Sequence, residues 1–196
     1  SYFGTAGSHQ PTSAGDTDIF LSKFNLDGQR LWSTYFGSAG NETCFLSNSP
    51  LALSGNSEFI TLLQYSEQST NLATPGSYMD TPPAPYVFSN PNLDVGYNRL
   101  MFAKFNDNGN LNWASYYGGS SKNLMYDNYM ASISIGVAND NTLYLYGSTR
   151  SNTGHTTPGA IQPNNTEENL VGYFARFDKK TEMSTTETDH LKDLVL

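Results

Sequence analysis

Cysteine, charge and long apolar runs are all scarce in this chain of 196 residues. Cys44 is the single cysteine, which excludes an internal disulfide framework, and its small and apolar neighbours favour a buried hydrophobic role. No apolar run approaches the roughly 18 residues that a membrane-spanning helix needs. We therefore expect a chain that does not span a membrane.

Basic residues are few even among the charged ones. The 10 Lys and Arg are outnumbered by 18 Asp and Glu, which gives a net charge of −8, and the largest basic cluster is Lys179–Lys180. A nucleic-acid-binding protein needs a basic surface that displaces counterions from phosphates. This balance excludes nucleic acid as a partner and is typical of a well-solvated acidic surface.

Motifs with catalytic chemistry are also missing. The chain has no Gly-x-Ser-x-Gly, His-Glu-x-x-His, phosphate-binding Walker loop or Cys-x-x-Cys. Asp16-Thr17-Asp18 and Asp107-Asn108-Gly109-Asn110 look like calcium loops, but counting back from Gly109 places Lys104 where the first oxygen ligand belongs. We predict no catalytic residue, no metal ligand and no cofactor.

Aromatic and small polar residues are abundant instead. The chain has 13 Tyr, 11 Phe and 2 Trp, and 61 of its residues are Ser, Thr or Asn. So many aromatic residues with so little charge exclude an intrinsically disordered chain. The composition favours a β-rich fold with many turns.

An internal repeat organises these residues. The stretch from Lys23 to Gly37 matches the stretch from Lys104 to Gly118 at a constant offset of 81, and a third copy begins at Phe174. The positions that recur are Lys23, Phe24, Gly28, Trp32, Tyr35 and Gly37, then Lys104, Phe105, Gly109, Trp113, Tyr116 and Gly118, and finally Arg176 and Phe177. We interpret all of them as structural.

A second marker recurs before each of these stretches, at Thr5, Thr74 and Thr157, and reads Thr-Pro-Gly in the last two copies. Two of the copies also contain two further strand-like segments, near 50–53 and 59–63 in one and near 132–137 and 142–146 in the other. Four short antiparallel strands per repeat are typical of a β-propeller blade.

The hairpins themselves are predicted from turn residues. Leu26-Asp27-Gly28 and Asp107-Asn108-Gly109 separate aromatic runs, so we expect tight turns in which both central residues take positive φ. The repeated Lys or Arg is interpreted as a structural cation that pairs with a carboxylate or an aromatic ring. Trp32 and Trp113 are expected to pack between blades.

These boundaries divide the chain into copies near 1–37, 38–118 and 119–178, followed by a polar linker over 179–196. The sequence thus predicts an all-β fold of about two and a half four-stranded blades. A closed ring needs about four to eight blades. We expect residues to be missing between Gly4 and Thr5, where the first copy is short, and the rest of the propeller to come from missing chain or from other subunits.

The pattern Phe-x-Lys-Phe-Asn-x-x-Gly-x-x-x-Trp-x-x-Tyr-x-Gly, joined to Thr-Pro-Gly and an intervening hairpin, resembles the SBBP-type bacterial β-propeller repeat. The resemblance covers roughly residues 1–178. It implies a secreted or outer-surface bacterial protein without a general catalytic activity. Many members end in a sorting domain for the type IX secretion system, and the polar tail could lead to such a domain.

One segment departs from the repeat. Residues 81–98 form a proline-rich insertion in the middle copy, and it carries Tyr86, Phe88 and Tyr97. A stiff loop that leaves a scaffold is a common place for binding, because less entropy is lost there. These three residues are our candidates for contact with a glycan or protein partner, and the alternative is an insertion that packs on its own blade.

The function expected is a non-enzymatic binding or display scaffold at a bacterial surface. One alternative is a polysaccharide-active propeller enzyme whose site lies in missing blades. A second alternative is a component of a surface filament or of a secretion assembly.

Overall fold

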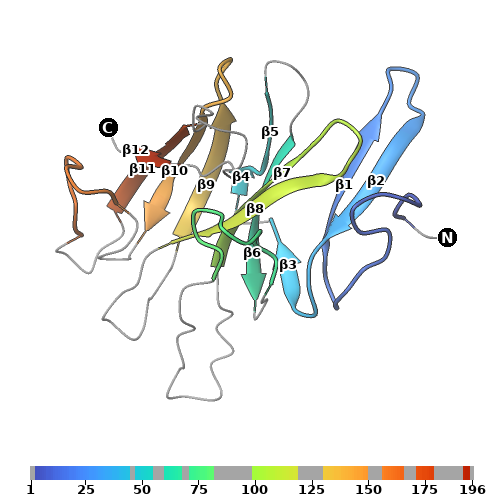
Figure 1. The fold of residues 1–196 in the computed structure, drawn as a ribbon, viewed down its shortest axis with the longest axis horizontal. Coiled ribbons are helices and arrows are strands. Elements are labelled where there is room, and N and C mark those ends of the chain that lie inside the picture. Colours follow the sequence, from blue (N-terminus) through green and yellow to red (C-terminus); the bar gives the residue numbers. More distant parts are fainter. Residues whose placement is uncertain are drawn as a thin grey trace.

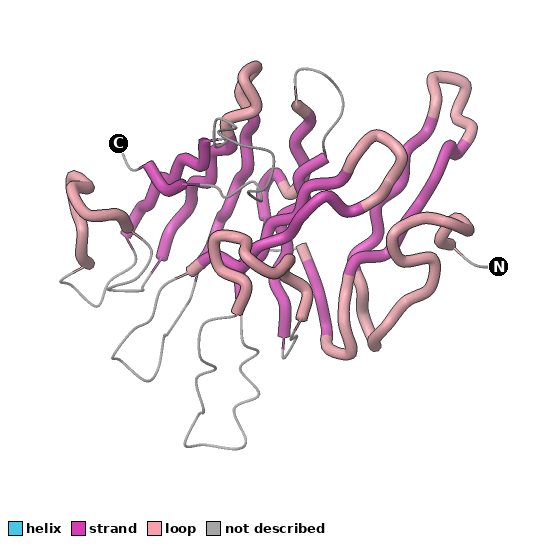
Figure 2. Tube along the Cα trace, in the orientation of Figure 1, coloured by secondary structure: helices cyan, strands magenta, loops and turns pink. Residues whose placement is uncertain are grey.

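The computed structural model describes residues 3–44, 47–54, 60–67, 71–81, 99–118, 130–149, 156–165, 171–178 and 192–194. Every regular element in these ranges is a β-strand. The described strands form three sheets, which lie side by side from the blue first sheet to the red last one (Figure 1), with loops joining their ends (Figure 2). The predicted fold class, all-β and an incomplete propeller, is confirmed.

The first sheet consists of β1 (Ile19–Phe24) and β2 (Arg30–Phe36). The second consists of β3 (Asn41–Thr43), β5 (Leu51–Leu53), β6 (Ile60–Glu67), β7 (Arg99–Phe105) and β8 (Leu111–Tyr117). The third consists of β4 (Ser47–Ser49), β9 (Met130–Val137), β10 (Leu143–Thr149), β11 (Val171–Asp178) and β12 (Lys192–Leu194).

Two of the sheets contain the four-stranded meander of a propeller blade. In the second sheet β5, β6, β7 and β8 pair antiparallel in chain order, and in the third sheet β9, β10, β11 and β12 do the same. The two inner strands of each blade lie where the sequence predicted them. The hairpin β1–β2 corresponds to the outer pair β7–β8, because Lys23↔Trp32 and Lys104↔Trp113 occupy the same place in the register.

The inner edge of the second sheet is more elaborate than the sequence predicted. β3 and β5 both pair with β6, β3 at Tyr65–Glu67 and β5 at Ile60–Leu62. Between them, β4 leaves this sheet and pairs parallel with β9 of the third sheet. One interrupted edge strand therefore links two neighbouring blades through backbone hydrogen bonds.

The C-terminal range differs from the expected linker. Residues 192–194 form β12, which pairs with β11 through Arg176↔Leu194 and Asp178↔Lys192. The sequence signal was weak because the strand is only three residues long and lacks the Trp that marks β2 and β8. β12 is therefore the outer strand of the third sheet and completes its four-stranded meander.

The loops that close β1–β2 and β7–β8 share one structure. The N–H of Gly28 donates to the Asn25 carbonyl oxygen over 3.1 Å, and the N–H of Gly109 to that of Asn106 over 3.0 Å. Each asparagine Oδ1 also accepts two backbone N–H groups of its loop. Within these described loops only the glycines have positive φ, 78° and 80°. The prediction of two positive φ values is therefore wrong, because a longer loop with a single left-handed glycine closes both hairpins.

Side chains alternate between the two faces of the second sheet, and both faces are buried. One face packs on the first sheet and the other on the third. The first cluster contains Ile19, Leu21, Trp32, Phe36, Met101, Ala103, Phe105, Ala114 and Tyr116. The second contains Leu100, Phe102, Tyr117, Ile135, Leu143, Leu145, Ala175 and Phe177. The protein thus has its core between sheets, as a propeller does.

The loops that begin at Thr5 and Thr74 run along the outer strands. The N–H of Thr5 donates to the Ser33 carbonyl oxygen, and the Ser33 N–H donates to Thr5 Oγ1. Thr74 and Ala114 repeat this pair of bonds at 2.9 and 3.0 Å. A strand edge covered in this way is closed to pairing with other chains.

Candidate functional site

The three aromatic residues proposed for ligand binding, Tyr86, Phe88 and Tyr97, lie outside the described residues. Their role stays a prediction. The described residues with the most specific geometry lie instead at the two junctions between sheets, and these junctions contain most of the repeated positions.

The first junction joins β1–β2 to the loop between β7 and β8. The indole Nε1 of Trp32 donates a hydrogen bond to the backbone oxygen of Asp107 over 2.8 Å. Lys23, the register partner of Trp32, forms an ion pair with the Asp107 carboxylate. The ring of Trp32 also covers Gly109, where a Cβ atom would lie 2.7 Å from the ring. Lys23 therefore has the carboxylate partner that the sequence interpretation gave it.

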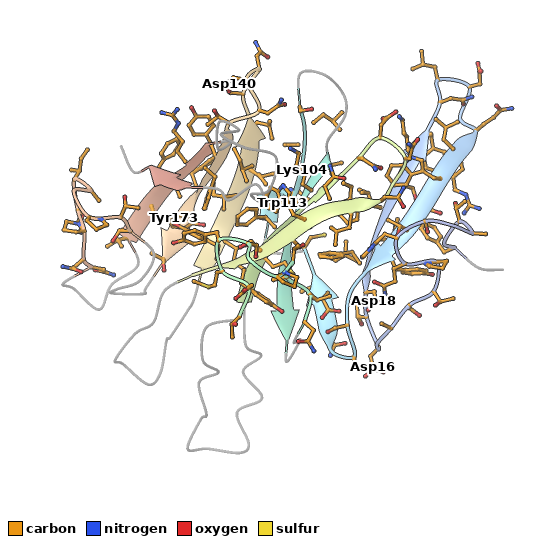
Figure 3. All side chains as sticks on the ribbon, in the orientation of Figure 1. Asp16, Asp18, Lys104, Trp113, Asp140 and Tyr173 are labelled. Atoms are coloured by element: carbon orange, nitrogen blue, oxygen red, sulfur yellow. The ribbon has the colours of Figure 1, made fainter. Side chains whose placement is uncertain are left out.

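At the second junction the equivalent pair is Lys104↔Trp113 (Figure 3). Trp113 is partly buried against the cluster between the second and third sheets, and it meets Phe102 edge-on at 5.4 Å. Trp32 thus contacts a neighbouring sheet, as expected from its recurrence, and Trp113 lies on the side of the second sheet that holds the cluster shared with the third. Arg176, the third cation of the series, pairs in register with Tyr144 on the opposite face of the third sheet from Ala175 and Phe177.

A set of three aromatic rings recurs at both junctions. At the first, His9, Phe36 and Phe105 lie with ring centroids 5.5 to 6.1 Å apart. At the second, Tyr78, Tyr117 and Phe177 lie 5.4 to 6.1 Å apart. These sets were not predicted from the sequence, although a signal existed: His9 follows Thr5, and Tyr78 follows Thr74, by four residues.

A buried hydroxyl also recurs. Thr34 Oγ1 accepts the N–H of Gln10, and Ser115 Oγ accepts the N–H of Met79, each over 2.9 Å. Each hydroxyl also donates to the carbonyl oxygen of the residue that follows it, over 3.0 Å. The two hydroxyls occupy equivalent positions, 81 residues apart. They anchor the loops that begin at Thr5 and Thr74 to β2 and β8.

Two carboxyl groups meet where β2 leads into β3. A side chain at Gly37 would overlap the carboxyl groups of both Asp18 and Glu42. Glu42 is buried and accepts the N–H and the hydroxyl of Ser38, each over 2.9 Å. Gln10 donates to Asp18 Oδ2 over 3.2 Å, and Asp18 Oδ1 is a buried atom without a hydrogen-bond partner among the described residues. These contacts fix the turn into β3.

Asp16 and Asp18, which belong to one of the two segments that look like calcium loops, lie together at one end of the first sheet (Figure 3). Among the residues that the structure describes, no three or more His, Cys, Asp or Glu side chains are grouped so that they could hold a metal ion. Cys44 is partly buried and packs against the first cluster.

Among the residues that the structure describes, three ionisable groups have clearly shifted pKa values. Burial lowers the pKa of His9, whose ring packs beside those of Phe36 and Phe105. The backbone N–H of Gly76 lowers the pKa of Asp80, and the backbone N–H of Thr142 lowers that of Asp140. In each of these carboxylates the charged form accepts hydrogen bonds within its own turn, so the shift reflects loop structure.

No protein-family model and no curated protein matches this chain. Within the described parts of the chain, no helix is long and apolar enough to cross a membrane.

Proposed function

We propose that the chain is part of a non-enzymatic β-propeller that serves as a binding or display scaffold. The observation that carries this proposal is the reuse of the same contacts in consecutive repeats. Asn25 and Asn106 close equivalent loops, and Thr5 and Thr74 anchor equivalent loops to outer strands. Repeated polar groups that hold strands and turns together leave binding to the segments that differ between repeats.

The contacts of ionisable residues in the junctions and turns support this proposal. Lys23 pairs with Asp107 across a junction, and the carboxylates of Asp80 and Asp140 accept hydrogen bonds from their own turns. A catalytic acid or base needs a pKa tuned toward neutral pH and access to a substrate. The lowered pKa values of Asp80 and Asp140 move these carboxylates away from that range.

The resemblance to SBBP-type repeats supports an exported protein at the surface of a bacterium, carried by the type IX secretion system. The Ser-, Thr- and Asn-rich composition with 14% charged residues agrees with such a location. We propose the insertion with Tyr86, Phe88 and Tyr97 as the ligand-contacting segment, because it is absent from the other repeats.

A glycan-array screen combined with a hydrolysis assay on the same glycans tests the scaffold proposal. We expect binding without turnover, and we expect the triple substitution Tyr86→Ser, Phe88→Ser and Tyr97→Ser to abolish it. The matched control is Leu26→Ser, which removes a fully exposed apolar side chain from a repeated turn. Turnover of a bound glycan would overturn the proposal in favour of a polysaccharide-active enzyme.

Export is tested separately in the bacterium that encodes the chain. Surface proteolysis of intact cells and immunodetection in the medium should both find the protein outside the cell. Deletion of the type IX translocon should retain it inside. Unchanged export in that deletion would contradict this route.

A further inference from the structure

The first and third sheets lie at the two ends of the row of sheets (Figure 1). Large apolar side chains are exposed on the outward faces of both. On the first sheet, the N-terminal face presents Phe20 and Phe24, each 56% exposed, on the side opposite Ile19 and Leu21, and the ring of Phe3 packs edge-on against Phe20 at 4.4 Å. On the third sheet, the C-terminal face presents Tyr146 and Phe174, 50% and 40% exposed, beside Tyr144 and Arg176. Monomeric proteins seldom leave such apolar sheet faces open to water.

The repeat shows what these faces correspond to. Phe20 and Phe24 are equivalent, at the offset of 81, to Met101 and Phe105, which are fully buried because the first sheet covers them. Phe174 is equivalent to Phe102, which is fully buried because the third sheet covers it. Each open face is therefore one half of an interface that the chain makes twice within itself.

The aromatic sets at the junctions support the same interpretation. Phe105 contacts two rings of the preceding sheet and its loop, and Phe177 contacts three. Phe24 is the third residue of this series and lies on the N-terminal face. At the other end, Ile161 follows Thr157 by four residues, as His9 follows Thr5, and it is 88% exposed. Phe24 at the N-terminal end thus lacks the covering side chain that its equivalents have. Ile161 at the C-terminal end is a covering side chain with nothing beneath it.

We propose that the two faces bind each other between copies of this chain, so that the C-terminal face of one copy covers the N-terminal face of the next. The occupant is a second copy because the molecule itself contains both complementary halves of its own repeated interface. Two different patches meet in such a contact, so association is head to tail, and it closes into a ring where the rotation between copies allows.

Sedimentation velocity on the 196-residue chain at physiological ionic strength tests this proposal. We expect a concentration-dependent heavier species. The double variant Phe20→Ser/Phe24→Ser should weaken association by roughly a hundredfold, because two large apolar side chains lose their cover. Tyr146→Ser/Phe174→Ser should do the same from the other face. Leu53→Ser, which removes a 59% exposed side chain from β5 of the second sheet, away from both end faces, is the matched control and should leave association unchanged.

Mixing the two double variants distinguishes head-to-tail contact from a symmetric one. Each variant keeps one intact face, so each should be monomeric alone while the mixture forms a dimer of the two. Far-UV circular dichroism should show that both variants keep their β-structure, since the replaced side chains are exposed. A monomeric unsubstituted chain, association that resists both double variants, or a mixture that stays monomeric would each overturn the proposal.

Discussion

Trp32 packs on the loop that contains Gly109 at the junction of the first and second sheets. The loop that contains Gly109 supplies the backbone oxygen that accepts the Trp32 indole N–H, and the glycine leaves room for the ring. Gly28, its equivalent in the first repeat, has nearly the same positive φ, but a Cβ atom added there would meet no atom within 4 Å. The two glycines thus separate the effect of backbone conformation from that of close packing.

Gly109→Ala should destabilise the protein more than Gly28→Ala. Both substitutions place a side chain at positive φ, which costs about 1–2 kcal/mol. Gly109→Ala in addition forces the ring of Trp32 to shift, and overpacking of this kind costs about 1–3 kcal/mol more. Chemical unfolding of both variants measures the difference, and equal losses would show that Trp32 does not lie against this loop.

His9 should make stability depend on pH. Burial holds its folded pKa below the ordinary value of 6.5, so in the window below 6.5 the unfolded chain binds more protons than the folded one. The free energy of unfolding should therefore fall as the pH drops through this window and level off below the folded pKa.

His9→Tyr should reduce that pH dependence while keeping an aromatic ring in place, since Tyr78 occupies the equivalent position in the next repeat. Urea unfolding of both proteins at neutral pH and at about pH 5 measures the effect. The same loss of stability in the variant as in the unsubstituted chain would assign the pH dependence to other groups.

At the scale of the element, each loop that begins at Thr5 or Thr74 forms hydrogen bonds along the free edge of an outer strand. Thr74 Oγ1 accepts a hydrogen bond from the N–H of Ala114, and the N–H of Thr74 donates one to the Ala114 carbonyl oxygen. Thr5 and Ser33 form the same pair of hydrogen bonds. The recurring threonine thus has a structural reason, which the Pro and Gly beside it do not reveal.

Thr74→Val should weaken this element without changing its shape. The variant leaves the buried N–H of Ala114 without its acceptor, which costs about 1–3 kcal/mol. Hydrogen exchange at the Ala114 amide should accelerate, and unfolding should require less denaturant. Thr81→Val, at an exposed position where the hydroxyl contacts only the neighbouring Asp80 among the described hydrogen bonds, is the control. An unchanged Ala114 exchange rate would contradict the proposed anchoring.

The sequence predicts these elements well where a repeat or a period marks them. The Lys–Phe and Trp–x–x–Tyr matches place β1, β2, β7 and β8, and alternation of apolar residues places β9 and β10. Short edge strands escape such reasoning, because three residues of β4 or β12 show no period and are defined by the backbone that they pair with.

The sites were harder to predict than the strands. The ring sets of His9 and Tyr78 join residues far apart in the chain, so their meeting depends on how sheets stack. The approach of the Asp18 and Glu42 carboxyl groups to Gly37 depends likewise on the turn there. The partner of Lys23 could be expected as a carboxylate, but only the stacking identifies it as Asp107.

At the scale of the whole molecule, stability comes from contacts between neighbouring sheets. The second sheet is covered on both faces, whereas the first and third are each covered on one. A row of this kind is stabilised by its repeats and by their interfaces. It also explains why the end sheets keep exposed Phe20, Phe24 and Phe174.

The most direct test of this account is the observation of ring-to-ring nuclear Overhauser effects across the two junctions. The centroids of Phe36 and Phe105 lie 5.5 Å apart, and those of Tyr117 and Phe177 lie 5.4 Å apart. We predict cross-peaks between both pairs in a sample with labelled aromatic residues, together with cross-strand signals within each sheet. Cross-strand signals without either ring-to-ring signal would show that the hairpins form but do not stack as consecutive blades.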